Sequence, residues 1–94
     1  MAIQIREGKY EYDTETGKLA PTHEELLRWH TWVNEQEAEF EGKYAGKYLA
    51  IWDEKIVGIG EDGGEAIESA KLWRSDVVPY IVYIPTEKEE LLLV

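Results

Sequence analysis

The sequence predicts a small α+β fold, a mixed or antiparallel sheet with two helices in the order ββ-α-ββ-α-β. Three patterns support this class. Apolar and polar residues alternate near the N-terminus, as they do in half-buried strands. After residue 22 the apolar residues recur at helical spacing instead. Two later segments, 48–52 and 80–84, are short and apolar on both faces, which is typical of central strands.

Residues 2–20 predict a β-hairpin. The alternation continues to Tyr12, and residues 13–17 supply turn-forming side chains, with Gly17 available for a positive φ. Pro21 then closes the hairpin.

A helix is expected over residues 22–41. It begins with a capping box, in which the Thr22 hydroxyl and the Glu25 carboxylate each accept a hydrogen bond from a backbone N–H. A break or fraying of the helix is expected near Gly42. At 100° per residue the apolar side chains form one stripe: Leu26, Trp29, Val33, Phe40 and Tyr44. The opposite face is charged: Glu24, Arg28, Glu35 and Glu39.

The second half of the chain predicts another hairpin and a last strand. Strands at 47–52 and 55–59 are joined by a tight turn at 53–54, and the last strand, 80–84, is ended by Pro85. Between them, a second capping box, Asp62-x-x-Glu65, starts a shorter helix. We expect that helix to run to about residue 73 with these side chains inward: Ala66, Ile67, Ala70 and Trp73.

A sheet built from two-sided apolar strands needs cover on both faces. The two helices could take one face each. Alternatively, both pack on one side, and the N-terminal hairpin or a second subunit covers the other. In either arrangement, strands 48–52 and 80–84 are expected to be central rather than edge strands.

Length and charge limit the classes of function. A chain of 94 residues has room for one domain, which we divide into an N-terminal hairpin extension (1–21), a core (22–85) and a charged, then Leu-rich tail (86–94). Twenty acidic residues against ten basic ones give a formal net charge of −10, which argues against binding nucleic acid. No apolar run approaches the roughly 20 residues of a membrane helix, and without a basic and then apolar start we expect no signal peptide. We expect a soluble, cytoplasmic protein.

The residue types carry further information. With no cysteine, disulfides and thiolate chemistry are excluded, and the scarcity of heat-labile side chains suggests a thermophilic source. Four Trp and six Tyr are many for so small a core, and these residue types are enriched at interfaces.

A family resemblance rests on three segments. These are FEGKYAGKYLAI from Phe40 to Ile51, IVGIGE at 56–61 and VYIP at 82–85. Together they resemble an uncharacterised family of short prokaryotic proteins with a Y-A-G-K-aromatic-hydrophobic-A core, a hairpin, a helix and a V-Y-[IV]-P strand. The resemblance covers roughly residues 30–85 and implies no activity, cofactor or catalytic residue. The N-terminal hairpin and the tail depart from the pattern.

One motif matches a nucleotide-binding fingerprint. Gly58-x-Gly60-x-x-Gly63 lies between a predicted strand and a predicted helix, as the dinucleotide fingerprint does. However, Glu61 and Asp62 would face a pyrophosphate with like charge, and the chain is too short for a full dinucleotide-binding fold. We therefore interpret the glycines as a tight turn into the helix and expect no cofactor.

Other reactive residue types also fail the spacing that chemistry needs. His23, His30 and Glu37 share a helix face, but seven residues of helix separate neighbours by about 10.5 Å, too far to chelate one ion. The segment at 13–17, DTETG, interrupts the Asp-Thr-Gly of aspartic proteases. Because acidic residues are everywhere, no carboxylate pair by itself indicates catalysis. We expect no metal site and no catalytic residues.

Two features remain as candidate interfaces. Trp32 projects away from the apolar stripe, either as an exposed anchor or partly buried beneath the N-terminal hairpin. The apolar tail residues are expected to pack as an added strand on this chain's sheet or a neighbour's: Leu91, Leu92, Leu93 and Val94. Acidic residues that would steer a basic partner are Glu35, Glu39, Glu61 and Asp62.

The predicted function is therefore a non-enzymatic protein–protein interaction module that forms a homo-oligomer through edge strands or its tail. An alternative is an acidic, antitoxin-like or nucleic-acid-mimicking inhibitor of a basic partner. A one-sided cluster of acidic residues would favour that alternative. A third class, a small enzyme or ligand-binding protein, would require a concave pocket that contains a desolvated carboxylate or histidine.

Overall fold

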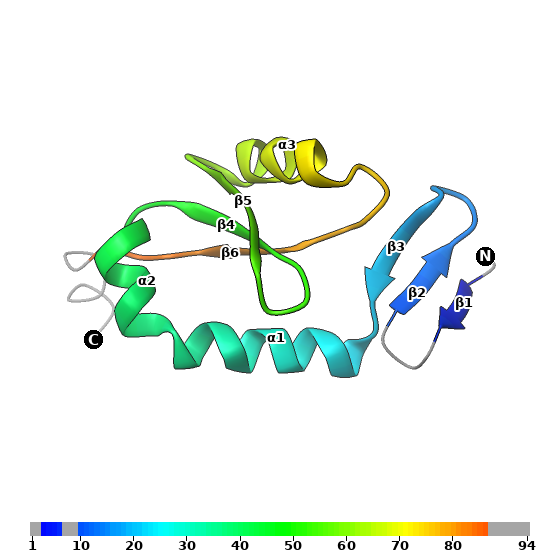
Figure 1. The fold of residues 1–94 in the computed structure, drawn as a ribbon, viewed down its shortest axis with the longest axis horizontal. Helices are drawn as coiled ribbons and strands as arrows, with labels where there is room; N and C mark the ends of the chain where they lie inside the picture. The colour runs from blue at the N-terminus through cyan, green and yellow to red at the C-terminus, as the bar shows by residue number, and fades with distance from the viewer. Residues whose placement is uncertain (1–2, 7–9, 87–94) are drawn as a thin grey trace.

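The computed structural model describes residues 3–6 and 10–86, in three helices and two antiparallel sheets (Figure 1). One sheet is an N-terminal meander, and the other is sandwiched between α1 and α2 below and α3 above in the view of Figure 1. The predicted α+β class is confirmed. The expected order and two-helix count are wrong, because the described elements run βββ-αα-ββ-α-β.

The meander comprises β1 (Ile3–Arg6), β2 (Tyr10–Asp13) and β3 (Lys18–Pro21), paired antiparallel in that order. The prediction of a single hairpin is wrong. Apolar and polar residues alternate on both sides of residues 7–9, so the pattern does not reveal that β1 and β2 are separate antiparallel strands. The second turn is as expected: Gly17 has φ +72° and its N–H donates to the Asp13 carbonyl at 2.8 Å.

The predicted helix over 22–41 is two helices, α1 (His23–Glu35) and α2 (Glu37–Tyr44). The break falls at Gln36 and not near Gly42, which lies inside α2. A straight 20-residue helix is about 30 Å long and would overrun strands of four or five residues. The break turns α2 across the end of the sheet (Figure 1), and Phe40 becomes buried in the core.

The central sheet has the order β5-β4-β6, from β4 (Tyr48–Ile51), β5 (Ile56–Gly60) and β6 (Tyr80–Tyr83). The predicted tight turn at 53–54 joins β4 to β5. β4 is central as expected, but β6 is an edge strand of this sheet, which corrects the prediction for 80–84. The apolar composition of β6 reflects helix packing on its faces rather than strands on both sides.

The third helix, α3 (Gly63–Trp73), begins at the second predicted capping box. The Asp62 carboxylate accepts from the Glu65 N–H, and the Glu65 carboxylate accepts from the Glu61 N–H, both at 2.8 Å. Ala66 and Ala70 are buried as predicted, but Ile67 and Trp73 are 38% and 45% exposed. Because α3 lies mainly over the edge strand β5, only a narrow alanine stripe reaches the sheet.

Each face of the central sheet is covered by helix. Ala50 packs against α3, whereas Leu49 and Ile51 lie in the cluster that contains Trp29 of α1 and Phe40 of α2. Of the two arrangements left open by the sequence, the structure therefore has the one with helices on opposite faces.

An aromatic column joins the meander to this core. Tyr10 of β2 stacks on Trp52 with ring centroids 5.2 Å apart, and Trp52 contacts Trp29 at 5.2 Å and Trp73 at 6.5 Å. Two backbone hydrogen bonds of 2.8 Å also connect Leu19 of β3 to residues 76 and 78. Several of the aromatic side chains therefore pack against one another within the chain.

Candidate interaction groove

The structure places Trp32 in a groove between the helix break and the β4–β5 turn. The cavity measures about 360 Å³, within the size range of small-ligand and side-chain pockets. We call it the Trp32 groove. It is lined by Trp32, Gln36, Glu39, Phe40, Lys43, Tyr44, Glu54, Lys55 and Ile56.

The inner part of the groove is aromatic. Trp32 is half-buried and meets Phe40 edge-on, with ring centroids 5.6 Å apart and planes at 73°. Tyr44, also half-buried, meets Phe40 at 5.8 Å and 68°. Phe40 itself is only 4% exposed. A fixed buried ring with two accessible neighbours provides a rigid apolar surface, the kind of surface that anchors a partner's side chain.

Charges of both signs surround these rings. Lys43 forms an ion pair with Glu39 at 3.2 Å, so each of these two groups already has a partner of opposite charge. Glu54 and Lys55 also line the groove, and within the described residues neither takes part in an ion pair. The charges available to a ligand are therefore those of Glu54 and Lys55.

The turn that carries Glu54 has an unusual backbone. Asp53 and Glu54 have φ of +52° and +57°, and backbone hydrogen bonds of 3.0 and 3.1 Å link Trp52 and Lys55 across them. A two-residue hairpin turn needs positive φ at both positions, which is why Asn-Gly is the preferred pair. A glutamate there costs about 1–2 kcal/mol, whereas aspartate is one of the few other residues that adopt this conformation. This strained backbone lies at the groove, because Glu54 is one of the residues that line it.

The predicted steering residues do not form one surface. Glu35 is exposed at the end of α1, and Glu39 is exposed on α2 and lines the groove. Glu61 pairs with Lys47, and Asp62 caps α3, on the opposite side of the central sheet (Figure 1). Their roles there are structural contacts of α3, so we do not group them with Glu35 and Glu39.

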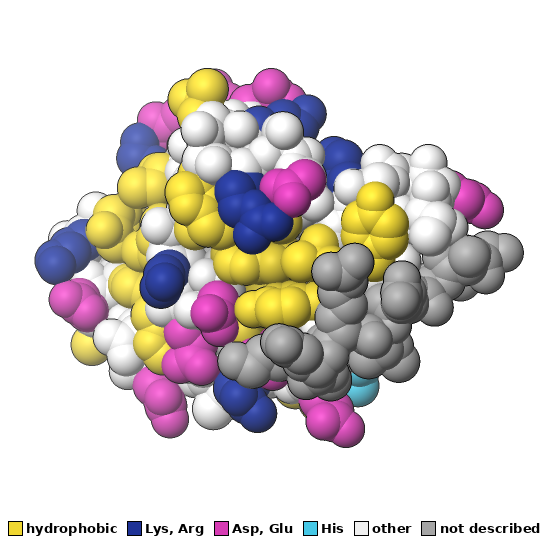
Figure 2. Space-filling view, turned by 45° about the vertical axis from the view of Figure 1, so that its right-hand side comes forward, with side chains coloured by type: hydrophobic (Ala, Val, Ile, Leu, Met, Phe, Trp, Pro, Cys, Tyr) yellow, Lys and Arg dark blue, Asp and Glu magenta, His cyan; other side chains and the backbone are white. Residues whose placement is uncertain are grey.

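Exposed acidic side chains within the described residues lie on several elements, among them α1, α2, the β4–β5 turn and α3. Acidic and basic side chains are interspersed on the face shown in Figure 2, and several carboxylates pair with a lysine or arginine. On the face shown, acidic side chains do not form the continuous cluster that a nucleic-acid mimic would present. Leu91, Leu92, Leu93 and Val94 lie outside the described residues.

The glycine fingerprint serves helix packing. A Cβ atom at Gly58 would lie 2.5 Å from the Ala66 carbonyl oxygen, and one at Gly60 would lie 2.5 Å from the Ala66 nitrogen. α3 therefore occupies the space directly against these glycines, and Asp62 caps its N-terminus. Gly58 and Gly60 lie within β5 rather than in the tight turn that was expected, and the close approach of α3 to the strand accounts for them.

One of the two histidines on the predicted helix face has a polar partner within the chain. His30 Nδ1 lies 2.8 Å from the Tyr80 hydroxyl, and burial raises the pKa of that tyrosine. Among the residues described, no three His, Cys, Asp or Glu side chains form a group that could hold a metal ion. No helix in the same part of the chain is long and apolar enough to span a membrane.

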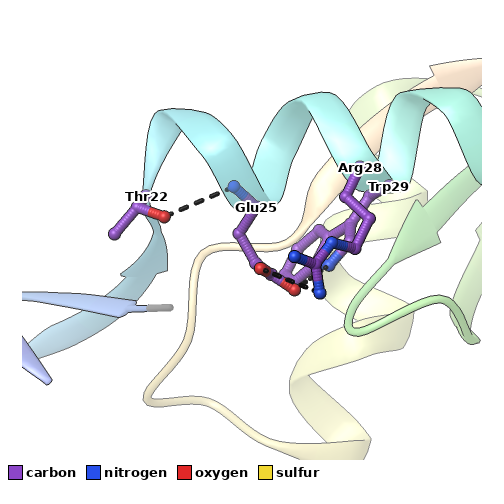
Figure 3. Close-up of polar contacts among 4 residues, drawn as sticks. All are labelled: Thr22, Glu25, Arg28 and Trp29. Atoms are coloured by element: carbon purple, nitrogen blue, oxygen red, sulfur yellow. Dashed lines mark hydrogen bonds and ion pairs between the residues drawn. The ribbon is translucent and has the colours of Figure 1, made fainter. Parts of the chain in front are cut away.

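Sequence reasoning missed a buried carboxylate, shown in Figure 3. Glu25 is 3% exposed and accepts a hydrogen bond from Trp29 Nε1 at 3.3 Å, with Arg28 at 3.7 Å. The Thr22 hydroxyl accepts from the Glu25 N–H as predicted, also at 3.3 Å. The sequence indicated only a capping role for Glu25, yet its carboxylate also accepts the hydrogen bond of the buried Trp29 indole. It does not line the Trp32 groove, so the groove has no desolvated carboxylate.

A second surface missed by the sequence surrounds the end of α3. Leu72 is 91% exposed, and the Arg74 guanidinium lies over the half-exposed Trp73 ring at 5.7 Å. Asp76 accepts two hydrogen bonds from Arg74, at 2.7 and 2.9 Å, and these lower the pKa of the Asp76 carboxyl. The helical stripe predicted Trp73 to be inward, and nothing in that periodicity distinguishes it from Ala70.

The family comparison covers the second half of this fold. Residues 39–87 match the Family of unknown function (DUF5678). The match runs from within α2 through β6 and includes every groove residue except Trp32 and Gln36. No curated protein and no solved structure shows a significant match to the chain. The resemblance to an uncharacterised family is thereby confirmed.

Proposed function

Because the chain belongs to the Family of unknown function (DUF5678), whose description carries no activity, we propose its function from its own geometry. The protein is a non-enzymatic interaction module that holds an apolar side chain of a partner protein in the Trp32 groove. The observation that carries this proposal is the half-buried Trp32 beside the buried Phe40, in a cavity of about 360 Å³. Aromatic side chains in such a setting commonly dominate binding energy.

The same geometry supports binding rather than catalysis. A catalytic groove needs an acid, base or nucleophile in a desolvated position. The buried carboxylate of Glu25 is committed to Trp29 and Arg28 away from the groove. The charged side chains that line the groove are all exposed: Glu39, Lys43, Glu54 and Lys55. Association therefore fits the groove better than acid–base chemistry.

The Trp32→Ala variant tests the proposal. A randomised peptide library displayed on phage, selected against the wild-type protein, is expected to yield peptides with an aromatic or branched apolar residue. Loss of the indole should weaken binding of these peptides about 30-fold, the effect of removing a hot-spot side chain worth about 2 kcal/mol. Fluorescence anisotropy measures the affinity.

The matched control is Leu27→Ala, which removes a 52%-exposed side chain of α1 that does not line the groove. Its peptide affinity should equal that of the wild type. Circular dichroism spectra establish that both variants fold. Selected peptides that bind Trp32→Ala as tightly as the wild type would contradict the proposal, as would a selection that yields none.

We also propose that the protein self-associates, an idea supported by the edge strand β6. Its sequence, Tyr-Ile-Val-Tyr, carries no charge, and lysine or another charge commonly protects exposed strand edges. Deleting residues 91–94 should lower the mass measured by light scattering if the tail mediates this contact. An unchanged mass would exclude the tail, and a monomeric wild-type protein would exclude self-association.

A further inference from the structure

The hairpin turn at the Trp32 groove consists of residues that such a turn does not prefer. Asp53 and Glu54 adopt positive φ, where Asn-Gly would give the same hairpin with less strain. Strained residues of this kind concentrate at binding sites, because function retains them against stability. Of the two, Glu54 lines the groove.

The Glu54 carboxylate is also the acidic group of the groove that is open to a ligand. Glu39, the other acid in the lining, is paired with Lys43 at 3.2 Å. Within the described part of the chain, Glu54 has no ion-pair partner and is exposed. It shares the groove with Trp32 and Tyr44, and aromatic faces attract cations.

We infer that Glu54 determines the charge of the groove's occupant, and that this occupant presents a lysine or arginine beside its apolar anchor. The inference rests on the proposed function and adds the chemistry of the partner. The net charge of −10 favours the approach of a basic segment. A carboxylate beside aromatic rings then binds its cation at short range.

Lys55 makes the inference testable, because it brings the opposite charge to the same groove. A basic occupant gains from Glu54 and is repelled by Lys55. An acidic occupant would show the reverse dependence. Removing each charge separately, as Glu54→Gln and Lys55→Gln, therefore reports the sign of the occupant's charge.

The probes are three synthetic nine-residue peptides, each with one central tryptophan and, on either side of it, four lysines, four glutamates or four serines. The lysine peptide should bind the wild-type protein most tightly. E54Q should weaken its binding about 5-fold and K55Q should strengthen it about 2-fold, changes typical of single partly exposed charges. Both effects should shrink in high salt. Glu35→Gln is the matched control for an exposed acid outside the groove lining.

Glu54→Gly supplies a readout that a merely structural role would not give. Glycine relieves the positive φ, so the Tm should rise by about 4 °C, while affinity for the lysine peptide falls as in E54Q. A lower Tm would show that Glu54 supports the fold and would overturn its assignment as a strained recognition residue.

The experiments distinguish failure of the proposed interaction function from failure of the inference about Glu54. If the serine peptide binds the wild type but not Trp32→Ala, and E54Q leaves the lysine peptide unaffected, the groove is an interaction site but Glu54 does not select charge. A preference for the glutamate peptide, lost in K55Q, overturns the inference in favour of an acidic partner. If none of the peptides binds the wild type, the proposed function fails and the inference fails with it.

Discussion

Gly58→Ala should lower the free energy of unfolding by about 3 kcal/mol, at the upper end of the cost of overpacking a core. The added Cβ atom would lie 2.5 Å from the Ala66 carbonyl oxygen and 2.7 Å from the Ala70 nitrogen. Both are backbone atoms of α3, so no side chain can rotate to make room. The helix must move away from β5, and its packing against the sheet is lost. Urea denaturation followed by circular dichroism measures the change.

Gly42→Ala is the matched control. Nothing lies within 4 Å of a Cβ atom at this position, which is inside α2. Alanine is the better helix former by up to about 1 kcal/mol, so this variant should be slightly more stable than the wild type. Equal midpoints for the two alanine variants would mean that α3 does not pack closely on β5.

Trp52→Ala should cost about 3–5 kcal/mol, the range for removing a large buried aromatic side chain. Trp52 is 5% exposed and contacts three other aromatic rings, those of Tyr10, Trp29 and Trp73. Its removal leaves a cavity between the meander and the central sheet. The midpoint of urea denaturation should fall accordingly.

Hydrogen exchange gives this variant a second measurement. Since Tyr10 stacks directly on Trp52, the amides of β2 and β3 should exchange faster relative to those of β4. Leu72→Ala is the control, because that side chain is 91% exposed and lies outside the aromatic column. Equal losses of stability in both variants would show that the column does not couple the meander to the core.

Local signals in the sequence were sufficient to predict where two helices begin and where two turns lie. Thr22 and Asp62 were predicted as helix caps, and each accepts the N–H three residues later. The turn before Gly17 and the tight turn at 53–54 also lie where expected. These features depend on side chains and backbone within a few residues of each other, so the sequence window contains all the interacting atoms.

Features that depend on distant elements were predicted poorly. The break at Gln36 follows from the length of the sheet, which a helical stripe does not encode. Trp73 and Ile67 satisfy the periodicity of an inward face, yet α3 lies at the edge of the sheet and leaves them exposed. Glu25 appears polar and capping in sequence, but Trp29 beneath it supplies the hydrogen bond that allows its burial.

The candidate groove combines both kinds of information. Trp32 was singled out because it projects from the apolar stripe, but Phe40, Tyr44 and Glu54 were not connected with it. Only the turn of α2 across the sheet and the close return of β5 bring these residues together.

By itself the sequence determined the α+β class, the helix caps, the turns at Gly17 and at residues 53–54, and the exclusion of cysteine chemistry. The tertiary structure decided where the long helix breaks, which aromatic side chains are buried and where a groove opens. The physical reason is range. Capping and turn geometry arise between neighbouring residues, whereas burial and cavities arise from the dimensions of elements that meet only after the chain has folded.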